Sequence, residues 1–423
     1  MILFGHPTGN PNSHQAALAH DETGQLEAFV VPWFPSRAAL AFLAALPPGR
    51  GMAQRLSRRR FEPLASAPMI QGRIGEVRRL LTRAAGRGDE SLAYEANDWL
   101  MRTMARECRR PSVRAVHSYE DCSLWQFEEA KRRGKACIYD MPIGYYPWWQ
   151  KKQAELAKRY ADWLPPGGLE CARLARPEQK LKEMELADLV LAPSSFVERT
   201  IREFHPEKKI ARASYGVDLE FWKPVEKSRG ARDEGRGLSS ALDARRSTLE
   251  GPSPLRFVYA GQCSIRKGIP VLLEAWQKAG LKDAQLELVG MWQLAENRLH
   301  QLPAGVSHRP PCSRDALRDR YQAADVFVFP SFFEGFGLVL LEAMACGLPA
   351  IASDASAGLD VINPSCGQVI MAGDLDGLVD SLRWFAANRD LLPGMKAAAR
   401  RAAELYTWQK YRNEVSGETK GFV

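Results

Sequence analysis

Short apolar runs alternate with longer amphipathic stretches along the first half of the chain. The runs are rich in Val, Ile, Leu and Phe, which predicts buried β-strands. These strands are expected at residues 2–5, 27–31, 113–117, 135–139, 188–192 and 210–214. Apolar residues recur at helical spacing in residues 35–46, 75–85, 91–108, 123–133 and 194–204. Alternating strands and helices predict a parallel, doubly wound sheet.

The same alternation returns in the second half of the chain. Strands are expected at residues 255–260, 286–289, 326–329 and 349–352, and helices at 313–324, 338–345, 374–387, 391–405 and from Ile269 onward. Between the halves, residues 226–253 contain almost no large apolar residue and many Gly, Ser, Arg and Glu, which is typical of a linker. The chain is therefore predicted to be α/β, with two Rossmann-like domains at residues 1–223 and 254–400 and a linker at 224–253.

Length and composition agree with this division, because 423 residues exceed the usual size of one domain. No apolar run approaches the roughly 18 residues of a membrane span, and the N-terminus lacks the features of a signal peptide. The eight cysteines show no C-x-x-C spacing, which predicts free thiols in a reducing cytosol and no zinc site. A net charge of +8 is a mild excess for this length, and we expect no nucleic-acid partner.

Basic residues concentrate in the first half of the chain. Five arginines, Arg50, Arg55, Arg58, Arg59 and Arg60, fall in residues 50–60, directly after the apolar run 38–46. One interpretation is peripheral docking of residues 50–60 to the anionic inner face of a membrane. The other is a core helix followed by a solvated run of charges.

Candidate ligand-binding residues of the first domain lie at predicted strand ends, where ligands of doubly wound sheets bind. They are Gly9 and Asn10 in the first loop, His117 at the end of its strand, and Tyr145 in the aromatic stretch 140–149. The first loop has no G-x-G-x-x-G pattern, so a dinucleotide is not expected. Each candidate has a structural alternative: an ordinary strand–helix turn, a hydrogen-bonded strand-end histidine, or an aromatic core.

Two loops of the second domain suit an anionic ligand. The first, residues 261–268, carries Arg266 and Lys267 and precedes a helix. The second carries Glu334 before Gly335, Phe336 and Gly337, and its helix begins at Leu338 and contains Glu342. Backbone N–H groups and the helix dipole favour phosphate at such loops, whereas the two carboxylates suit sugar hydroxyls.

These motifs resemble the retaining glycosyltransferases of family GT4, which have the two-domain GT-B fold. The E-x7-E motif reads from Glu334 to Glu342, preceded by A-D-V-F-V-F-P-S and followed by A-M-A-C-G-L-P-A. The second domain carries nearly the whole pattern, and the first matches more loosely through its first loop, His117 and Y-G-V-D. The resemblance implies domains facing across a cleft, and a last helix, residues 401–423, that crosses back to the first domain.

The resemblance also implies roles for individual residues. Lys267 would neutralise the donor diphosphate, Glu334 would hold the transferred sugar, and Glu342 would hold the ribose. The donor-binding set would be Gly261, Gln262, Arg266, Lys267, Glu334, Gly335, Phe336, Gly337, Leu338 and Glu342. His117 would join Glu334 and Lys267 in the catalytic group, and Gly9, Asn10 and Tyr145 would face the acceptor.

The implied activity is metal-independent transfer of a hexose from a nucleotide-diphosphate sugar to a glycan, lipid-linked or small-molecule acceptor, without a bound cofactor. Cell-envelope polysaccharide is an expected product, and the expected location is cytoplasmic, at the inner membrane face. Three departures stand out. Gln262 stands where the family often has Arg, and His117-Ser118-Tyr119 stands in place of H-x-H. The acid that the family often has after a glycine pair beyond the second motif appears here only as Asp360, after Ala357-Gly358-Leu359. A sugar-nucleotide epimerase and a non-catalytic sugar-nucleotide-binding protein remain alternatives.

Overall fold

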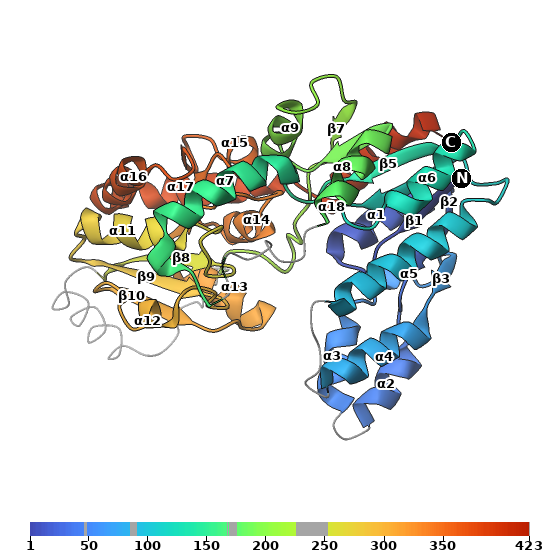
Figure 1. Cartoon of the computed structure of the whole chain (residues 1–423). Helices are drawn as coiled ribbons and strands as arrows, with labels where there is room; N and C mark the ends of the chain where they lie inside the picture. The colour runs from blue at the N-terminus through green and yellow to red at the C-terminus, as the bar shows by residue number, and fades with distance from the viewer. Residues whose placement is uncertain (46–48, 85–90, 167, 169–175, 226–252, 423) are drawn as a thin grey trace. The chain divides into compact units, whose positions relative to one another are not determined.

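The computed structural model describes residues 1–45, 49–84, 91–166, 168, 176–225 and 253–422. Most of the predicted linker, residues 226–252, lies outside these described residues. The chain forms two compact units (Figure 1). The first comprises residues 1–150, 171–216 and 408–423, and the second comprises residues 151–170 and 217–407.

A seven-stranded parallel sheet forms the centre of the first unit. Its order is β3-β2-β1-β4-β5-β6-β7. The strands are β1 (Ile2–Gly5), β2 (Leu26–Val31), β3 (Met69–Gln71), β4 (Ala115–Tyr119), β5 (Ala136–Asp140), β6 (Leu189–Ala192) and β7 (Ile210–Arg212). Every residue of β1, β4 and β6 is buried, as expected for strands covered on both faces.

Helices of the first unit connect these strands. They are α1 (Pro11–Glu22), α2 (Arg37–Ala45), α3 (Gly49–Ser57), η1 (Glu62–Leu64), α4 (Arg73–Ala84), α5 (Ser91–Glu107), α6 (Leu124–Arg132), α8 (Pro177–Leu186), α9 (Ser195–Arg202), α18 (Trp408–Thr419) and η4 (Lys420–Phe422). Asn10 and Ser13 form a capping box that starts α1. Helix α18 packs on α1, where the Arg412 Nε atom lies 2.8 Å from Glu22 Oε2.

A six-stranded parallel sheet, ordered β10-β9-β8-β11-β12-β13, forms the centre of the second unit. The strands are β8 (Leu255–Ala260), β9 (Ala284–Val289), β10 (Val306–Arg309), β11 (Val326–Phe329), β12 (Ala350–Ser353) and β13 (Gly367–Ile370). The helices are α11 (Ile269–Ala279), α12 (Glu296–Leu299), α13 (Arg314–Ala323), α14 (Leu338–Ala345), α15 (Gly358–Val361), α16 (Leu375–Ala387), η3 (Arg389–Leu391) and α17 (Leu392–Glu404). The predicted architecture of two doubly wound α/β sheets is thus confirmed.

One segment from the first half of the chain packs in the second unit. Helix α7 (Tyr146–Arg159) starts in the first unit, and its residues from 151 onward, with η2 (Ala161–Trp163), belong to the second. Trp163 accepts a hydrogen bond from the Ala295 amide at 3.0 Å, and the Arg298 guanidinium lies 4.7 Å from the Trp163 ring centroid. The predicted first domain, residues 1–223, included this segment, which the structure places in the second unit.

Candidate functional site

Two loops meet at the carboxyl ends of the adjacent strands β8 and β11. The Phe332 amide donates to the Arg266 carbonyl at 2.8 Å, which ties the loops together. Gly268, the residue before α11, has φ 76°, and a Cβ there would lie 2.0 Å from the Pro330 carbonyl oxygen. Only glycine fits this contact without displacing the neighbouring backbone.

Glu334 is the central carboxylate of this loop pair. Its side chain is buried and forms an ion pair with the Lys267 ammonium, and Arg266 Nη1 lies 3.7 Å from Glu334 Oε1. Burial alone would raise the pKa of Glu334, but the charges of Lys267 and Arg266 outweigh it and hold this pKa below its usual value. The loops therefore carry one carboxylate and two cations.

The positions of both cations are fixed by further contacts. Arg266 Nη1 donates to the Phe333 carbonyl at 2.9 Å, and its Nη2 donates to Gln262 Oε1 at 3.4 Å. The Lys267 Nζ atom lies 5.6 Å from the centroid of the Phe329 ring, a cation–π distance. Gln262 thus helps to hold Arg266.

Helix α14 begins directly after the Glu334 loop. Gly337 precedes it with φ 87°, and a Cβ on Gly337 would lie 2.6 Å from the Phe329 ring. Gly335 and Phe336 are buried, whereas Gly337 and Leu338 are partly exposed. The first amides of α14 thus follow Glu334 within a few residues, and amides at a helix N-terminus are a common anion-binding group.

Glu342 is partly buried on α14. Burial raises its pKa to about 7, and the opposing effect of Arg314 is smaller. This carboxyl therefore changes charge near neutral pH, unlike Glu334. Of the predicted donor-binding residues, the structure joins Gln262, Arg266, Lys267 and Glu334 by direct contacts.

The predicted loop residues of the first unit surround His6. The Gly9 amide donates to His6 Nδ1 at 2.9 Å, and Asn10 caps α1. Gly9 has φ 68°, a conformation that favours glycine. Both residues lie at the carboxyl end of β1.

His117 and Tyr145 are buried in the first unit. His117 is fully buried in β4, and its Nδ1 atom lies 2.9 Å from His20 Nε2, with Asp140 Oδ2 3.7 Å from its Nε2. Burial lowers the pKa of His117 to about 3, so the ring is neutral at pH 7. Tyr145 is 1% exposed, and its hydroxyl lies 2.9 Å from His205 Nε2. These contacts favour the structural interpretation of both residues, and their predicted roles stay untested.

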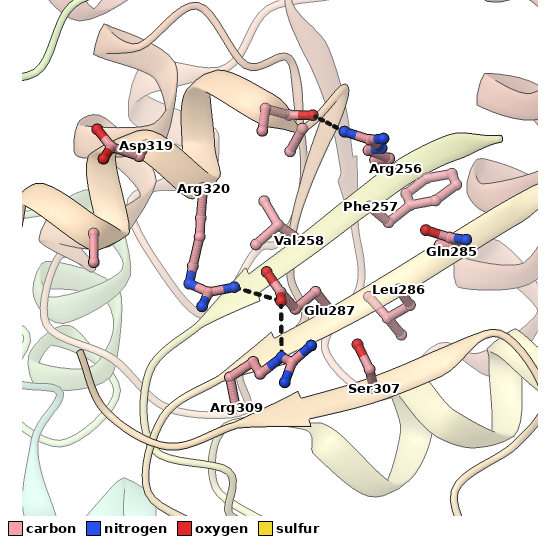
Figure 2. A pocket seen from close by; sticks show the side chains of 13 residues that line it. Arg256, Phe257, Val258, Gln285, Leu286, Glu287, Ser307, Arg309, Asp319 and Arg320 are labelled. Carbon is pink, nitrogen blue, oxygen red and sulfur yellow. Dashed lines mark hydrogen bonds and ion pairs between the residues drawn. The ribbon is translucent and has the colours of Figure 1, made fainter. Parts of the chain in front are cut away.

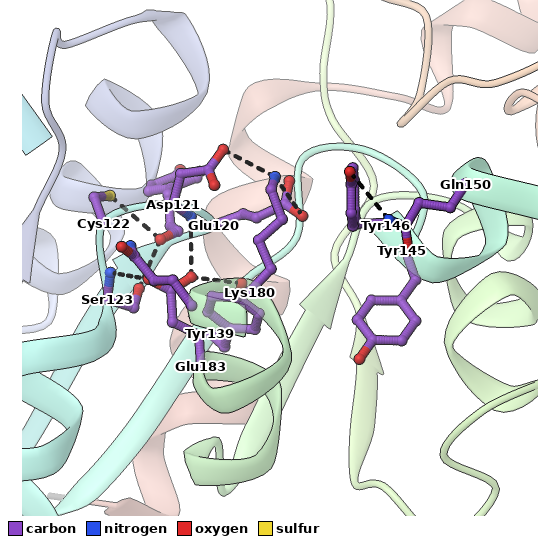
Figure 3. Close-up of polar contacts among 12 residues, drawn as sticks. Glu120, Asp121, Cys122, Ser123, Tyr139, Tyr145, Tyr146, Gln150, Lys180 and Glu183 are labelled. Atoms are coloured by element: carbon purple, nitrogen blue, oxygen red, sulfur yellow. Dashed lines mark hydrogen bonds and ion pairs between the residues drawn. The ribbon is translucent and has the colours of Figure 1, made fainter. Parts of the chain in front are cut away.

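A charged cluster that the sequence predictions missed follows β4 (Figure 3). Lys180 Nζ, from α8, lies 3.1 Å from Glu120 Oε1 and 2.9 Å from Asp121 Oδ2. The Tyr146 ring centroid is 5.3 Å from the same ammonium. Burial raises the pKa of Glu120 to about 7 against the opposing effect of Lys180. The signal in the sequence was the acidic pair Glu120-Asp121 immediately after a strand.

Two further residues missed from the sequence lie at the carboxyl end of the second sheet. Arg159 Nη1 lies 3.4 Å from the Gly373 carbonyl oxygen, and the ring centroids of Tyr160 and Phe332 are 6.2 Å apart. Phe332 belongs to the Glu334 loop. No local pattern marks this contact, since 159–160 and 332 are far apart in the chain.

A groove of about 510 Å³ lies elsewhere in the second unit, over β8, β9, β10 and α13 (Figure 2). Glu287 lies within it and pairs with Arg320 at 2.5 Å and with Arg309 at 3.5 Å. None of the residues of the Glu334 loop lines this groove. Glu287 thus partly neutralises Arg309 and Arg320 within the groove.

Two features are absent from the described residues: a metal-ligating cluster and a membrane-spanning helix. Among those residues, no group of three or more His, Cys, Asp or Glu side chains is arranged to hold a metal ion. Asp374, part of a D-x-D spacing, accepts from the Gly377 amide at 2.9 Å and caps α16. No helix within the described ranges combines the length and apolar character needed to cross a bilayer.

Comparisons with known proteins identify the class to which this fold and loop pair belong. Residues 242–402 match the family described as Glycosyl transferases group 1. A D-inositol 3-phosphate glycosyltransferase from Streptomyces bingchenggensis is 32% identical over 213 residues, which cover 46% of this chain and 44% of that protein. The chain therefore matches less than half the length of this curated relative.

Solved structures are similar over nearly the whole chain. Sucrose-phosphate synthase from Thermosynechococcus elongatus is 17% identical with a TM-score of 0.61, covering 99% of this chain and 98% of that one. Anabaena Alr3699/HepE in complex with UDP-glucose is 14% identical with a TM-score of 0.59, covering 99% of each chain. The fold is thus GT-B, and residues 242–402 match the glycosyl transferases group 1 family, GT4. Both predictions from the sequence are confirmed.

Proposed function

We propose that this protein is a retaining hexosyltransferase that moves a sugar from a nucleotide-diphosphate sugar to a glycan, lipid-linked or small-molecule acceptor. The observation that carries the proposal is the buried Glu334 carboxylate between Lys267 and Arg266, directly before α14. This loop pair offers positive charge and amides to a diphosphate and a fixed carboxylate to sugar hydroxyls. The family match and the UDP-glucose bound by HepE support this assignment.

The proposed donor contacts follow from the charges. Lys267 and Arg266 meet the diphosphate together with the amides of Gly335–Leu338, and Glu334 accepts from the transferred sugar. Negative charge develops on the leaving diphosphate as its bond to the sugar carbon breaks, so fixed cations and amides stabilise the transition state. Glu342 accepts from the ribose hydroxyls.

In a front-side mechanism, which retains configuration without a protein nucleophile, the acceptor oxygen attacks the face from which the diphosphate leaves. The acceptor proton then passes to the departing phosphate oxygen, and no protein nucleophile or metal enters the step. We assign the acceptor to the first unit, where Gly9, Asn10 and the Glu120–Lys180 cluster lie at strand ends. Carboxylates and an ammonium at such a position suit hydroxyl-bearing acceptors.

A thermal-shift screen across UDP-, GDP- and ADP-sugars tests the donor assignment. One donor class is expected to raise the melting temperature of the wild type and of Lys282→Ala, an exposed lysine of the same unit, but not of Lys267→Ala. No shift with any donor would overturn the proposal. Incubation with the stabilising donor alone supplies a second outcome, because an epimerised donor would identify an isomerase.

Metal independence has its own test. Transfer, measured as nucleoside diphosphate released with an acceptor mixture, is expected to continue in the presence of EDTA. Loss of turnover in EDTA that added Mg²⁺ or Mn²⁺ restores would overturn this part of the proposal.

We also propose a cytoplasmic, peripheral location at the inner face of a membrane, with the acceptor among cell-envelope glycans. The basic residues 50–60 of the first unit support this location. Binding of the purified chain to anionic vesicles and not to neutral ones is the expected result, and equal binding to both would contradict an electrostatic attachment.

A further inference from the structure

Helix α2 is apolar in composition but is not packed in a core. Its sequence, RAALAFLAA, contains one polar residue, and none of its residues is buried. Phe42 is 66% exposed. Helix α11, IPVLLEAWQKA, buries eight residues although it carries more polar side chains. Single exposed apolar residues are common in proteins, but an apolar helix with no buried residue, of which Ala38, Ala41, Phe42, Ala44 and Ala45 are exposed, indicates a surface that something covers.

The helix is joined to the first unit through its neighbour α3. The two helices pack against each other, and Ala53 and Leu56 of α3 are buried. Figure 1 shows α2, α3 and α4 grouped at one end of the first unit, away from β1. Helix α2 is therefore held on a folded support rather than hanging as a loose segment.

The charge around α2 is strongly positive. Residues 36–62 contain six arginines and one acid, Glu62. Three of these arginines are engaged by carboxylates: Arg37 and Arg60 pair with Glu62, at 3.0 and 2.7 Å, and Arg59 pairs with Glu76 at 2.7 Å. Arg50 and Arg58 are exposed.

We infer that α2 is an interfacial helix that inserts into an anionic lipid bilayer, with Phe42 at the acyl boundary and Arg50 and Arg58 at the lipid phosphates. An apolar face beside basic residues matches both parts of such a surface, and a stable peripheral attachment needs two signals of this kind. A second copy of the chain would bring two positive faces together, which electrostatic repulsion opposes. This inference rests on the peripheral location proposed above. It differs in attributing the attachment to insertion of α2 as well as to the basic residues 50–60.

The experiment is co-sedimentation of the full-length chain with vesicles of phosphatidylcholine, alone or with phosphatidylglycerol at about 30% of the lipid, enough to give an anionic surface. Wild type is expected to pellet with the anionic vesicles. Phe42→Ser and the double variant Arg50→Glu/Arg58→Glu are each expected to lower the vesicle partition coefficient about tenfold or more. The matched controls are Leu405→Ser, which alters an equally exposed residue of the second unit, and Lys282→Glu; both are expected to pellet like wild type.

The outcomes separate the inference from the proposals on which it rests. Pelleting that depends on Arg50 and Arg58 but not on Phe42 would keep the membrane contact and overturn insertion of α2. No pelleting with either vesicle would overturn both, while the donor screen would still decide the glycosyltransferase assignment. A dimer in size-exclusion chromatography that Phe42→Ser abolishes would assign the face to a second copy, and would also overturn the inference. Equal melting temperatures of Phe42→Ser and wild type would exclude misfolding, because Phe42 is exposed.

Discussion

The two units place acids near the carboxyl ends of parallel strands, but they shift the pKa values of these acids in opposite directions. In the second unit, Glu334 lies between Lys267 and Arg266, and these charges lower its pKa in spite of burial. In the first unit, Asp140 ends β5 beside His117, and burial raises the pKa of Asp140 to about 7 while it lowers that of His117 to about 3. The Lys267–Glu334 pair is charged at neutral pH, whereas His117 of the Asp140–His117 pair is neutral.

This difference separates a site for an anionic ligand from a polar core. The Lys267–Glu334 pair can rearrange when a diphosphate binds, because Lys267 can then contact phosphate as well as Glu334. The His20–His117–Asp140 group is buried and linked by the His20 Nε2–His117 Nδ1 contact, while His20 Nδ1 and His117 Nε2 have no hydrogen-bond partner among the described residues. Variants of the two groups should therefore affect different properties.

The largest expected effect is on turnover by Lys267→Ala. Loss of a fixed cation at the leaving diphosphate should lower kcat/KM by roughly 100- to 1,000-fold, since such groups act mainly on the transition state. Steady-state release of nucleoside diphosphate measures it, with Lys282→Ala as the control. A loss below about threefold would place the diphosphate elsewhere.

The next effect is on stability and concerns the joint between the two loops of the second unit. Gly268→Ala should lower the free energy of unfolding by about 3 kcal/mol, because it adds a Cβ 2.0 Å from the Pro330 carbonyl oxygen at a left-handed φ. Gly280→Ala is the matched control: Gly280 has φ 61°, but a methyl group added there would meet no neighbouring atom within 4 Å. Urea unfolding of the two variants separates the steric contact from backbone strain. Equal losses of unfolding free energy would show that the contact with Pro330 does not destabilise the protein.

The sequence was sufficient to predict the central strands and the E-x7-E loop. Long apolar runs such as 326–329 and the glycines near Glu334 are local signals that do not depend on the rest of the fold. The edge strands β3, β10 and β13 were not predicted. β10 reads VSHR and has no buried residue, so it lacks the apolar pattern that marks a central strand.

The side-chain partners could not be predicted from the sequence. Lys267 and Glu334 are separated by 67 positions, and their pairing depends on β8 and β11 being neighbours in the sheet. Likewise, His117 was predicted to face a ligand, and only the packing of α1 against the sheet places His20 beside it. Periodicity predicts which elements form, whereas contacts between distant elements arise from their tertiary arrangement.

A smaller effect is expected for His117→Ala in the first unit. Removing the buried ring leaves a cavity and deprives His20 of its partner, which should lower the free energy of unfolding by roughly 2–3 kcal/mol. The kcat of the folded protein should stay within about threefold of wild type, in contrast to Lys267→Ala. His300→Ala, at an exposed position, is the control for both measurements. A large loss of kcat without loss of stability would support the predicted catalytic role of His117.

The smallest expected effect is a pair of opposite pH dependences within the second unit. The pKa of Glu342 is raised from 4.5 to about 7, so its contribution to stability is fully present below pH 4.5 and is lost as the pH rises towards 7. The pKa of Glu334 is lowered, so its contribution is present above pH 4.5 and is lost as the pH falls through its folded-state pKa. The variants Glu342→Gln and Glu334→Gln remove one titration each. Relative to wild type, Glu342→Gln should gain melting temperature as the pH rises from 4.5 through 7, whereas Glu334→Gln should lose melting temperature as the pH rises through the folded-state pKa of Glu334, which lies below 4.5. Two differences of the same sign would show that Glu334 is not held as an ion pair, and the contrast between charged and neutral carboxyls would then fail.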